Sequence, residues 1–391
     1  MNKPIYLLAA FLIFLFTACQ EEGGSAVAKE DKEPIVLPPE ADDYEEEYYK
    51  WGYINKGGRV VIPAIYDDCR QFKEGYAVVR KKGYWGFIDK RGKEVIKPQY
   101  KAAWSFSEGL ARVQLYDSDS IGFVDPKGNW QIEAKYEDGK DFSEGLACVK
   151  SGGLFGYVDK TGKLVIPFSF SEAERFENGT AKVKKGRGYG FIDTSGKLLL
   201  EPKYDAVYSF SEGLARVKKK GQYGFVNRKG KLVIPCQFLS AQDFNVELAV
   251  AKAKDKFGLI DKRGKFVIDE KYKDLWYAGN ELWGATILGK SGFLKKDGAP
   301  LGPFKYEMLY GFSEGLAGYQ RDGLWGYLNT AGEEITPPHF GLIWDFQEGF
   351  ARVAHLDGVG FIDKTGELTL GAEWGDVRDF SGGLARVQVL D

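Results

Sequence analysis

Residues 85–100 read WGFIDKRGKEVIKPQY, and residues 106–113 read FSEGLARV. Both phrases return along the chain, with a glycine equivalent to Gly86 at positions 52, 86, 122, 156, 190, 224, 258, 292, 326 and 360. The step between these glycines is 34 residues, with one step of 36. A fixed period of this length is typical of repeat proteins, so one unit used ten times decides the fold.

Four further positions of the unit are almost invariant when each of these glycines is counted as position zero. Position +6 is glycine and position +14 is aromatic in all ten units. Position +20 is phenylalanine in nine units, with Ala278 as the exception, and position +25 is alanine in nine, with Trp283 as the exception. Composition alone does not produce this agreement, so each position has a defined structural role.

The second unit predicts three short strands. Residues 86–89 are rich in β-formers, and Asp89 and Gly92 are typical of a hairpin loop that starts with an Asx turn and needs a glycine at positive φ. Residues 94–96 form the second strand. A proline at +11 or +12 in seven units is expected to end the regular pairing, because proline has no N–H to donate. Residues 110–113 form the third strand.

The third strand alternates in character. Positions +25 and +27 are mostly small or β-branched, whereas +26 and +28 are each basic in five units, which predicts that the first pair faces inward and the second faces solvent. The mainly aromatic positions +1, +14 and +20 are too many for one short unit to bury. Neighbouring units must therefore share a core, and the predicted fold is an all-β tandem array of ten three-stranded units.

These units resemble the WG repeat family of bacterial β-repeat proteins, whose pattern runs W-G-F-I-D-x-x-G-K-x-V-I-x-P-x-Y and then F-S-E-G-L-A-x-V. Trp51-Gly52, Trp85-Gly86 and Trp325-Gly326 keep the eponymous dipeptide, and the resemblance covers residues 51–391. Trp283-Gly284 falls at +25 and +26, so it does not start a repeat. The resemblance implies an all-β repeat architecture. It implies no catalytic residue and no settled ligand.

Two arrangements of the units are compatible with the sequence. The units could stack as an open solenoid, or they could form a closed, propeller-like ring. A period of 34 residues is short for a four-stranded blade, which usually takes about 40–45 residues, and this favours solenoid-like stacking. The first unit is preceded by residues 48–50, and the last ends after its third strand at Leu390. In a ring these two ends could pair.

Residues 1–18 have the features of a secretory signal peptide. Lys3 is followed by an apolar run over residues 5–16, too short to span a bilayer but long enough for the signal's hydrophobic region. Residues 16–19, Phe-Thr-Ala-Cys, resemble the lipobox of bacterial lipoproteins, which predicts that Cys19 is lipidated and becomes the first residue of the mature protein. The alternative is an ordinary secretory signal in which Cys19 falls by chance.

Residues 19–47 are predicted to form an acidic, extended tether. Between residues 21 and 47, eleven Asp and Glu residues stand against Lys29 and Lys32, a net charge of -9. With +1 from Lys3, the total of -2 leaves +6 for residues 48–391. Self-repulsion and proline keep such a segment from packing, so it holds the repeats away from the membrane. The predicted location is the bacterial cell envelope, most simply as an outer-membrane lipoprotein, with the cell surface as one option.

The residue types that usually carry catalysis are scarce. His339 and His355 are the only histidines, and both are expected in loops or at strand ends. Cys69, Cys148 and Cys236 show neither metal-ligand nor disulfide spacing. The repeated Asp-x-x-Gly turn lacks the alternating acidic ligands of a calcium loop. We therefore expect no catalytic site, no bound metal and no cofactor.

The outward positions of the third strand supply a candidate binding face. If the units stack, the basic residues at +26 and +28 form a ladder that could bind an acidic protein or glycan. The alternative is a solvated face neutralised by the glutamates at +22. Nucleic acid is excluded as the partner by the export signal and the mild net charge. The residues of this candidate basic face are Arg80, Arg112, Lys150, Lys182, Lys184, Arg216, Lys218, Lys252, Arg352 and Arg386.

Three functions follow from these features. The first is a non-enzymatic scaffold, attached to the membrane through Cys19, that binds an envelope protein or glycan. The second is an envelope spacer without a specific ligand. The third is a hydrolase of envelope polymers, which would need two carboxylates without charge partners in one pocket.

Overall fold

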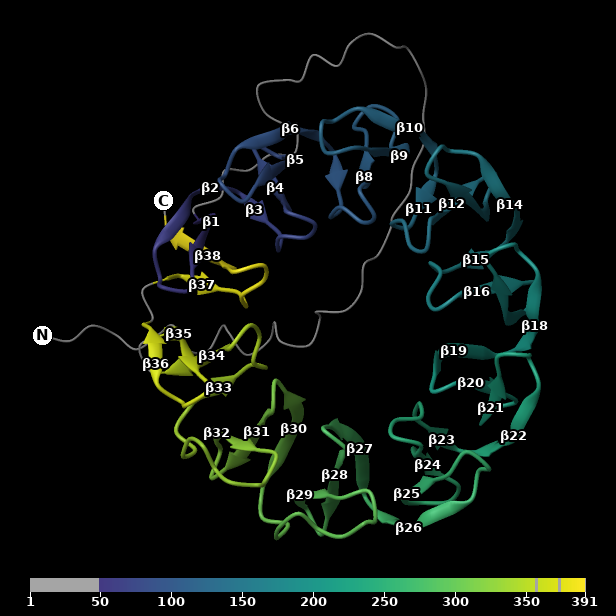
Figure 1. Ribbon diagram of the computed structural model, residues 1–391, viewed down its shortest axis with the longest axis vertical. Helices are drawn as coiled ribbons and strands as arrows, with labels where there is room; N and C mark the ends of the chain where they lie inside the picture. The colour runs from purple at the N-terminus through teal and green to yellow at the C-terminus, as the bar shows by residue number, and fades with distance from the viewer. Residues whose placement is uncertain (1–48, 356–357, 372–373, 391) are drawn as a thin grey trace, which may run out of the picture. The chain divides into compact units, whose positions relative to one another are not determined.

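The computed structural model describes residues 49–355, 358–371 and 374–390, all of which belong to one compact unit spanning residues 35–391. These residues form ten small antiparallel β-sheets. The described segments contain no helix, so none of them offers a helical membrane span. The sheets follow one another as blades around a closed ring (Figure 1). The predicted all-β repeat fold is confirmed.

Each blade begins with a strand nearest the centre of the ring. These first strands, in the order of blades 1 to 10, are β3 (Asp68–Cys69), β7 (Ala102–Ala103), β11 (Asp138–Gly139), β15 (Glu172–Ala173), β19 (Ala206–Ser211), β23 (Ser240–Ala241), β27 (Asp274–Gly279), β30 (Met308–Ser313), β33 (Leu342–Ile343) and β37 (Asp376–Val377). The second strands are β4 (Tyr76–Lys81), β8 (Ala111–Gln114), β12 (Leu146–Ser151), β16 (Thr180–Lys185), β20 (Leu214–Lys219), β24 (Ala249–Lys252), β28 (Leu282–Ile287), β31 (Leu316–Arg321), β34 (Phe350–His355) and β38 (Leu384–Leu390).

The third and fourth strands of each blade come from the following repeat. The third strands are β5 (Tyr84–Asp89), β9 (Ile121–Val124), β13 (Leu154–Asp159), β17 (Gly188–Asp193), β21 (Gln222–Asn227), β25 (Phe257–Ile260), β29 (Lys290–Leu294), β32 (Leu324–Asn329), β35 (Gly358–Asp363) and β1 (Tyr49–Asn55). The outermost strands are β6 (Glu94–Tyr100), β10 (Trp130–Tyr136), β14 (Leu164–Phe170), β18 (Leu198–Tyr204), β22 (Leu232–Phe238), β26 (Phe266–Tyr272), β36 (Leu368–Leu370) and β2 (Val60–Tyr66). In blades 7 and 8 isolated bridges replace this strand.

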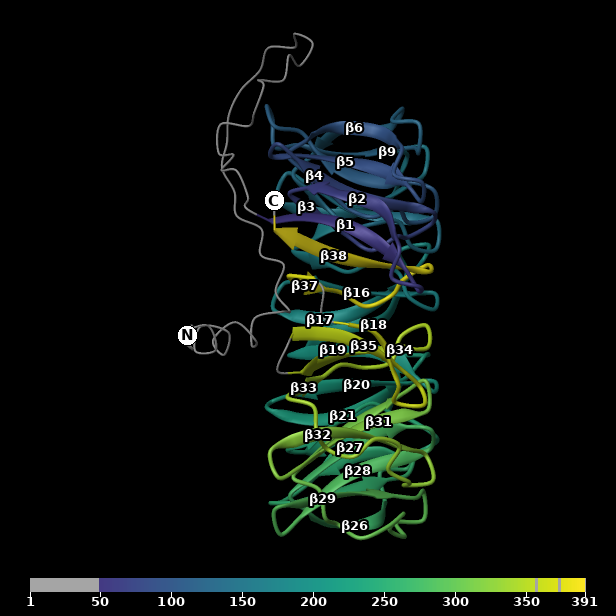
Figure 2. The same cartoon turned by 90° about the vertical axis from the view of Figure 1, so that its left-hand side faces the viewer.

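The two ends of the chain close the ring. Strand β1 pairs antiparallel with β38 over seven residue pairs, from Tyr49 with Leu390 to Asn55 with Leu384, so blade 10 combines β37 and β38 with β1 and β2. Figure 2 shows these four strands side by side. Closure removes the exposed sheet edges that an open array would leave at its two ends.

The ring is therefore the second of the two arrangements that the sequence allowed, and the preference for stacking drawn from the short period was wrong. Each blade also uses a first strand that the sequence pattern did not reveal, at positions +16 and +17. This strand has only two residues in seven of the ten blades. A four-stranded blade consequently fits into 34 residues.

The hydrophobic core is divided among the ten interfaces between blades. In the interface between blades 1 and 2, for example, Phe87 and Tyr100 of one sheet meet Phe106 and Val113 of the next. Nine repeats bring the aromatic rings at +1 and +20 together across such an interface, with centroids 4.8–5.0 Å apart. This confirms that neighbouring units share a core. Both faces of every sheet are consequently covered.

The seventh repeat fills its part of the shared core with different residues. Ala278 replaces the phenylalanine at +20, and Trp283 replaces the alanine at +25. Trp283 is fully buried in the cluster that also holds Leu259, Tyr272 and Leu294. The large side chain fills the space that the missing phenyl ring leaves, because protein interiors are close-packed. The Trp283-Gly284 dipeptide therefore belongs to this exchange of core residues and does not start a repeat.

The Asp-x-x-Gly segments form the predicted turns. In blade 1, Asp89 Oδ1 accepts hydrogen bonds from the main-chain N–H groups of Arg91 and Lys93, at 2.9 and 3.0 Å, and Gly92 has φ +79°. The role predicted for proline is only partly confirmed. The register shifts near Pro98, but β6 continues through it to Tyr100, which pairs with Trp85. An outer-edge strand tolerates proline because the missing N–H interrupts no further ladder.

Candidate functional site

The arginines at +26 lie between blades, so their predicted exposure to solvent was wrong. Arg112 and Arg352 are buried, and Arg216 is half-buried. In all three blades the guanidinium lies over the +18 ring of its own repeat, 3.6–4.4 Å from the centroid, and pairs with the +19 aspartate of the next blade. The pairs are Arg112 with Asp141, Arg216 with Asp243, and Arg352 with Asp379. Because each sheet face abuts a neighbouring blade, alternation cannot point these side chains outward.

The two other basic residues at +26 are also engaged. Arg386 of blade 10 donates a hydrogen bond from Nη1 to the main-chain oxygen of Cys69 in blade 1, and its guanidinium lies 5.8 Å from the centroid of Trp51. Lys182 lies 3.9 Å from a carboxylate oxygen of Glu174 in its own blade. No basic residue at +26 therefore contributes a free charge to a solvent-exposed ladder in the described part of the chain.

The glutamates at +22 do not neutralise the +26 and +28 row either. In blade 9, the Glu348 carboxylate accepts hydrogen bonds from the main-chain N–H groups of Gly382 and Gly383 in the next blade, at 2.6 and 3.0 Å. It also forms an ion pair with Lys56, at 3.3 Å. Equivalent contacts connect other pairs of neighbouring blades, and we call all of these contacts together the glutamate lock. The further glutamates whose carboxylates bind main-chain N–H groups of the next blade are Glu74, Glu108, Glu144, Glu212 and Glu314.

Four lysines at +28 form the part of the candidate face that remains continuous. Each lies over the aromatic ring directly opposite it, on the third strand of the same blade, in the four consecutive blades 3 to 6. The Nζ-to-centroid distances are 5.6 Å for Lys150 and Phe155, 5.0 Å for Lys184 and Tyr189, 5.2 Å for Lys218 and Tyr223, and 5.3 Å for Lys252 and Phe257. Arg80, at the same position of blade 1, donates from Nε to the Gly83 oxygen at 3.5 Å.

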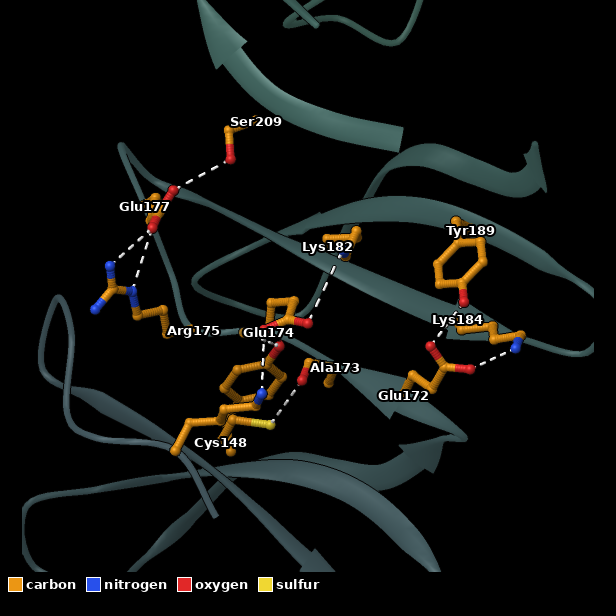
Figure 3. A network of polar contacts seen from close by, with 12 residues as sticks. Cys148, Glu172, Ala173, Glu174, Arg175, Glu177, Lys182, Lys184, Tyr189 and Ser209 are labelled. Atoms are coloured by element: carbon orange, nitrogen blue, oxygen red, sulfur yellow. Dashed lines mark hydrogen bonds and ion pairs between the residues drawn. The ribbon is translucent and has the colours of Figure 1, made fainter. Parts of the chain in front are cut away.

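Blade 4 holds the most extensive polar network near this row (Figure 3). Glu172 on β15 forms an ion pair with Lys184 and accepts a hydrogen bond from the Tyr189 hydroxyl at 2.7 Å. Lys184, and then Tyr189, lower the pKa of Glu172, and Glu172 in turn raises the pKa of Lys184. Lys184 is thus held charged but locally neutralised. Lys150, Lys218 and Lys252 make no ion pair with any described residue.

A set of exposed cations without ion pairs lies just beyond this row, at positions that the sequence analysis did not single out. These residues occupy the hairpins between the second and third strands of blades 4, 5 and 6. All are exposed, and none forms an ion pair within the described segments. The residues, which we call the basic hairpin face, are Lys185, Arg187, Lys219, Lys220, Lys254 and Lys256. In the sequence these residues stand in K-G-R at 185–187, K-K at 219–220 and K-D-K at 254–256, within positions +29 to +32 of three consecutive repeats.

The remaining candidates for chemistry among the described residues are two histidines and three cysteines. His339 and His355 are exposed, with ring centroids 5.6 Å apart, and His339 Nδ1 lies 2.7 Å from the Pro337 oxygen. The thiols of Cys69 and Cys148 are buried and that of Cys236 is half-buried. Within residues 49–355, 358–371 and 374–390, no three His, Cys, Asp or Glu side chains are placed to hold a metal ion.

Asp345 of blade 9 and Asp379 of blade 10 interact electrostatically. Burial raises the pKa of Asp345, and the charge of Asp379 raises it further. Asp379, however, is paired with Arg352 at two points. A pocket of about 60 Å³ beside Phe293 and Tyr306 is also far below the roughly 300–1,000 Å³ of small-molecule sites. Neither feature meets the requirement stated above for a hydrolase.

The repeat boundaries can be compared with known protein families. The model of the WG containing repeat matches residues 51–85, 85–117, 121–155, 155–187, 189–223, 223–257, 292–325, 325–357 and 360–391. The chain belongs to the WG containing repeat family. The one repeat between these matches is the seventh, in which Ala278 and Trp283 exchange the core residues. A search of curated proteins gave no match.

Some solved structures are similar to this WG repeat protein at low identity. A eukaryotic initiation factor is 13% identical with a TM-score of 0.46, and the match covers 76% of this chain and 95% of that chain. The AfRom2 CNH domain is 12% identical with a TM-score of 0.29, over 58% and 92%. PorZ, a surface component of the type-IX secretion system of Porphyromonas gingivalis, is 10% identical with a TM-score of 0.27, over 80% and 54%. These similarities say nothing about the ligand of the WG repeats.

Proposed function

We propose that this WG repeat protein is a non-enzymatic binding scaffold of the bacterial cell envelope, anchored through a lipid on Cys19. The observation that carries the proposal is that one set of residues in the repeat stabilises the ring while another set forms its exposed loops. The residues that hold the ring together, such as Phe106, Glu108 and Arg112, are used between blades. The hairpins between the second and third strands differ from blade to blade, from Asp117 and Asp119 in blade 2 to Lys219 and Lys220 in blade 5. A uniform frame with variable exposed loops suits recognition.

The anchor belongs to the part of the chain outside the described residues. Residues 1–18 would be removed, Cys19 would carry the lipid, and residues 19–47 would link it to the ring. The described chain enters the ring at Tyr49, which pairs with Leu390 at the hairpin end of blade 10. An unidentified envelope protein or glycan is the expected partner, at the outer membrane.

Replacement of Cys19 by serine tests the anchor. We expect the Cys19→Ser protein to be released from the membrane fraction, whereas the unaltered protein stays in it and partitions into detergent. Continued membrane retention of the variant, with the same resistance to salt washing, would contradict lipid anchoring at Cys19.

Crosslinking in the intact envelope tests the scaffold role. A photoreactive residue placed at Lys220, in the hairpin of blade 5, is expected to capture the same protein or glycan in repeated experiments. The same residue placed at Lys229, at the opposite end of that blade, serves as the control. Absence of any reproducible product from either position would favour the alternative of a spacer without a specific ligand.

A further inference from the structure

The basic hairpin face has a regular construction across three consecutive blades. Lys185 pairs with Gly188 at the end of the β16–β17 hairpin, and Lys219 pairs with Gln222 at the equivalent place in β20–β21. Residues 252–257 form the same connection between β24 and β25. Successive blades carry equivalent hairpins on the same face of a ring, and Figure 1 shows these three blades as neighbours. The cations therefore repeat at similar intervals along an arc.

Each of these hairpins adds an aromatic ring to its exposed cations. Tyr189, Tyr223 and Phe257 are only partly buried, and each lies beneath a lysine of the adjacent strand, 5.0–5.3 Å from Nζ to centroid. An aromatic face stacks on apolar sugar surfaces, and an ammonium group pairs with carboxylate or phosphate. The site thus repeats a ring and a set of positive charges once per blade.

Among the described hairpins between second and third strands, those of blades 4 to 6 carry two exposed cations each, and that of blade 1 carries one, Lys82. The corresponding hairpin of blade 2 carries Asp117 and Asp119, and that of blade 8 carries Asp322. Within blades 4 to 6, Glu172 is satisfied by Lys184 and Tyr189, so it does not cancel the exposed lysines. At the hairpin of blade 6 there are two acids: Asp255, and Glu270, whose carboxylate accepts the main-chain N–H groups of Ala253 and Lys254 at 2.6 and 3.0 Å. On this face of the ring, the six cations would therefore steer an acidic ligand to blades 4 to 6.

We propose that the basic hairpin face binds a linear acidic polysaccharide that runs along blades 4 to 6. This inference rests on the proposed scaffold function and gives it a ligand class. A polymer that alternates sugar rings and acid groups matches a site that repeats aromatic rings and cations. A binding site spread over three blades gains affinity from several weak contacts at once.

The test uses the full chain with Cys19→Ser and polygalacturonate as the probe, with uncharged dextran as the control polymer. The test variant carries Lys219→Gln, Lys220→Gln, Lys254→Gln and Lys256→Gln. The matched control removes four exposed cations from the opposite ends of the same two blades, through Lys229→Gln, Lys231→Gln, Arg263→Gln and Lys265→Gln. Both variants change the net charge equally and leave every core residue in place.

We expect the unaltered ring to bind polygalacturonate but not dextran, with an affinity that falls as salt rises. The hairpin variant is expected to bind at least about tenfold more weakly, and the control variant to bind within about twofold of the unaltered ring. Equal losses in both variants, or no binding of polygalacturonate by the unaltered ring, would overturn the proposal. So would hairpin-dependent sedimentation with phosphatidylglycerol vesicles in the absence of polygalacturonate binding. A crosslinked protein partner that the hairpin variant retains would support the scaffold function while rejecting the glycan.

Discussion

Arg352 of blade 9 and Asp379 of blade 10 form a two-point ion pair, with Nε 2.5 Å from Oδ1 and Nη2 3.2 Å from Oδ2. The Trp344 ring lies 4.4 Å from the guanidinium carbon, and the main-chain oxygen of Val377 accepts a bond from Nη1 at 3.0 Å. A sheet face that is covered by its neighbour can hold a charged side chain only if that neighbour supplies its partners. The pair therefore acts as a connector between blades.

Replacing Arg352 by leucine should lower the free energy of unfolding by about 2–4 kcal/mol, because Asp379 then remains largely buried without its counter-charge. The measurement is the urea midpoint of the purified ring. The control is Arg187→Leu, at an exposed hairpin without an ion pair, where a change within about 0.5 kcal/mol is expected. The double variant Arg352→Leu with Asp379→Leu should recover part of the loss. If it is no more stable than Arg352→Leu alone, the connector role is wrong.

The glycine at position zero should tolerate no side chain. A Cβ on Gly190 would lie 2.2 Å from the Leu200 oxygen and 2.9 Å from the Pro202 nitrogen, both in the backbone of the outermost strand of the same blade. We expect Gly190→Ala to destabilise the ring by about 3 kcal/mol, because that backbone must move. Gly302→Ala, where nothing lies within 4 Å of the added Cβ, should change stability by less than about 0.5 kcal/mol. Equal midpoints for the two variants would refute this account of the repeat glycine.

The glutamate lock should make the ring sensitive to acid. In Glu348, burial opposes ionisation, but the N–H groups of Gly383 and Gly382 and the charge of Lys56 outweigh it and lower the pKa below 4.5. The pKa values of Glu108, Glu212 and Glu314 are lowered in the same way. A lowered folded-state pKa stabilises the ring above the unfolded-state pKa, and this contribution disappears as the pH falls through the folded-state value.

The urea midpoint should consequently fall between about pH 5 and pH 3. Replacing all four of these glutamates by glutamine should lower the midpoint at neutral pH and reduce its further fall in acid. The double variant Glu133→Gln with Glu201→Gln, at exposed positions of outer strands, should keep the full acid dependence. An unchanged pH profile in the fourfold variant would show that the lock does not couple protonation to stability.

The three described cysteines should differ in reactivity. Burial raises the pKa of Cys69 and of Cys148 to about 12, and it raises the pKa of the half-buried Cys236 as well. Because the thiolate is the reactive form, Cys236 should react first with a thiol reagent at pH 8 in the Cys19→Ser protein. Cys69 and Cys148 should react only when urea unfolds the ring. Cys69 lies at the interface between blades 10 and 1, so its early reaction would show that these two blades separate.

Several elements could be predicted from the repeat because local physics governs them. Asp89 and Gly92 specify their turn within four residues, and the rings at +1, +14 and +20 must be buried wherever the neighbours lie. The first strand of each blade was not predicted from the sequence. In most blades it has only two residues, such as Ala102–Ala103 or Asp138–Gly139, and two residues are too few to show an alternating pattern. The candidate basic face also contains residues whose positions follow from local sequence and residues whose positions do not. The +28 lysines could be named from alternation along one strand, whereas the position of the +26 arginines depends on the adjoining blade.

The sequence by itself determined the ten-fold repeat, the all-β class and the residues that form each shared core, since these depend on period, alternation and turn chemistry. Only the tertiary structure decided that β1 pairs with β38, that Arg352 meets Asp379, and that the hairpins of blades 4 to 6, with two exposed cations each, lie on neighbouring blades (Figure 1). The reason is physical. Closure depends on a small rotation between neighbouring sheets, accumulated over ten interfaces, and residues more than 300 apart in sequence meet only when that rotation sums to a full turn.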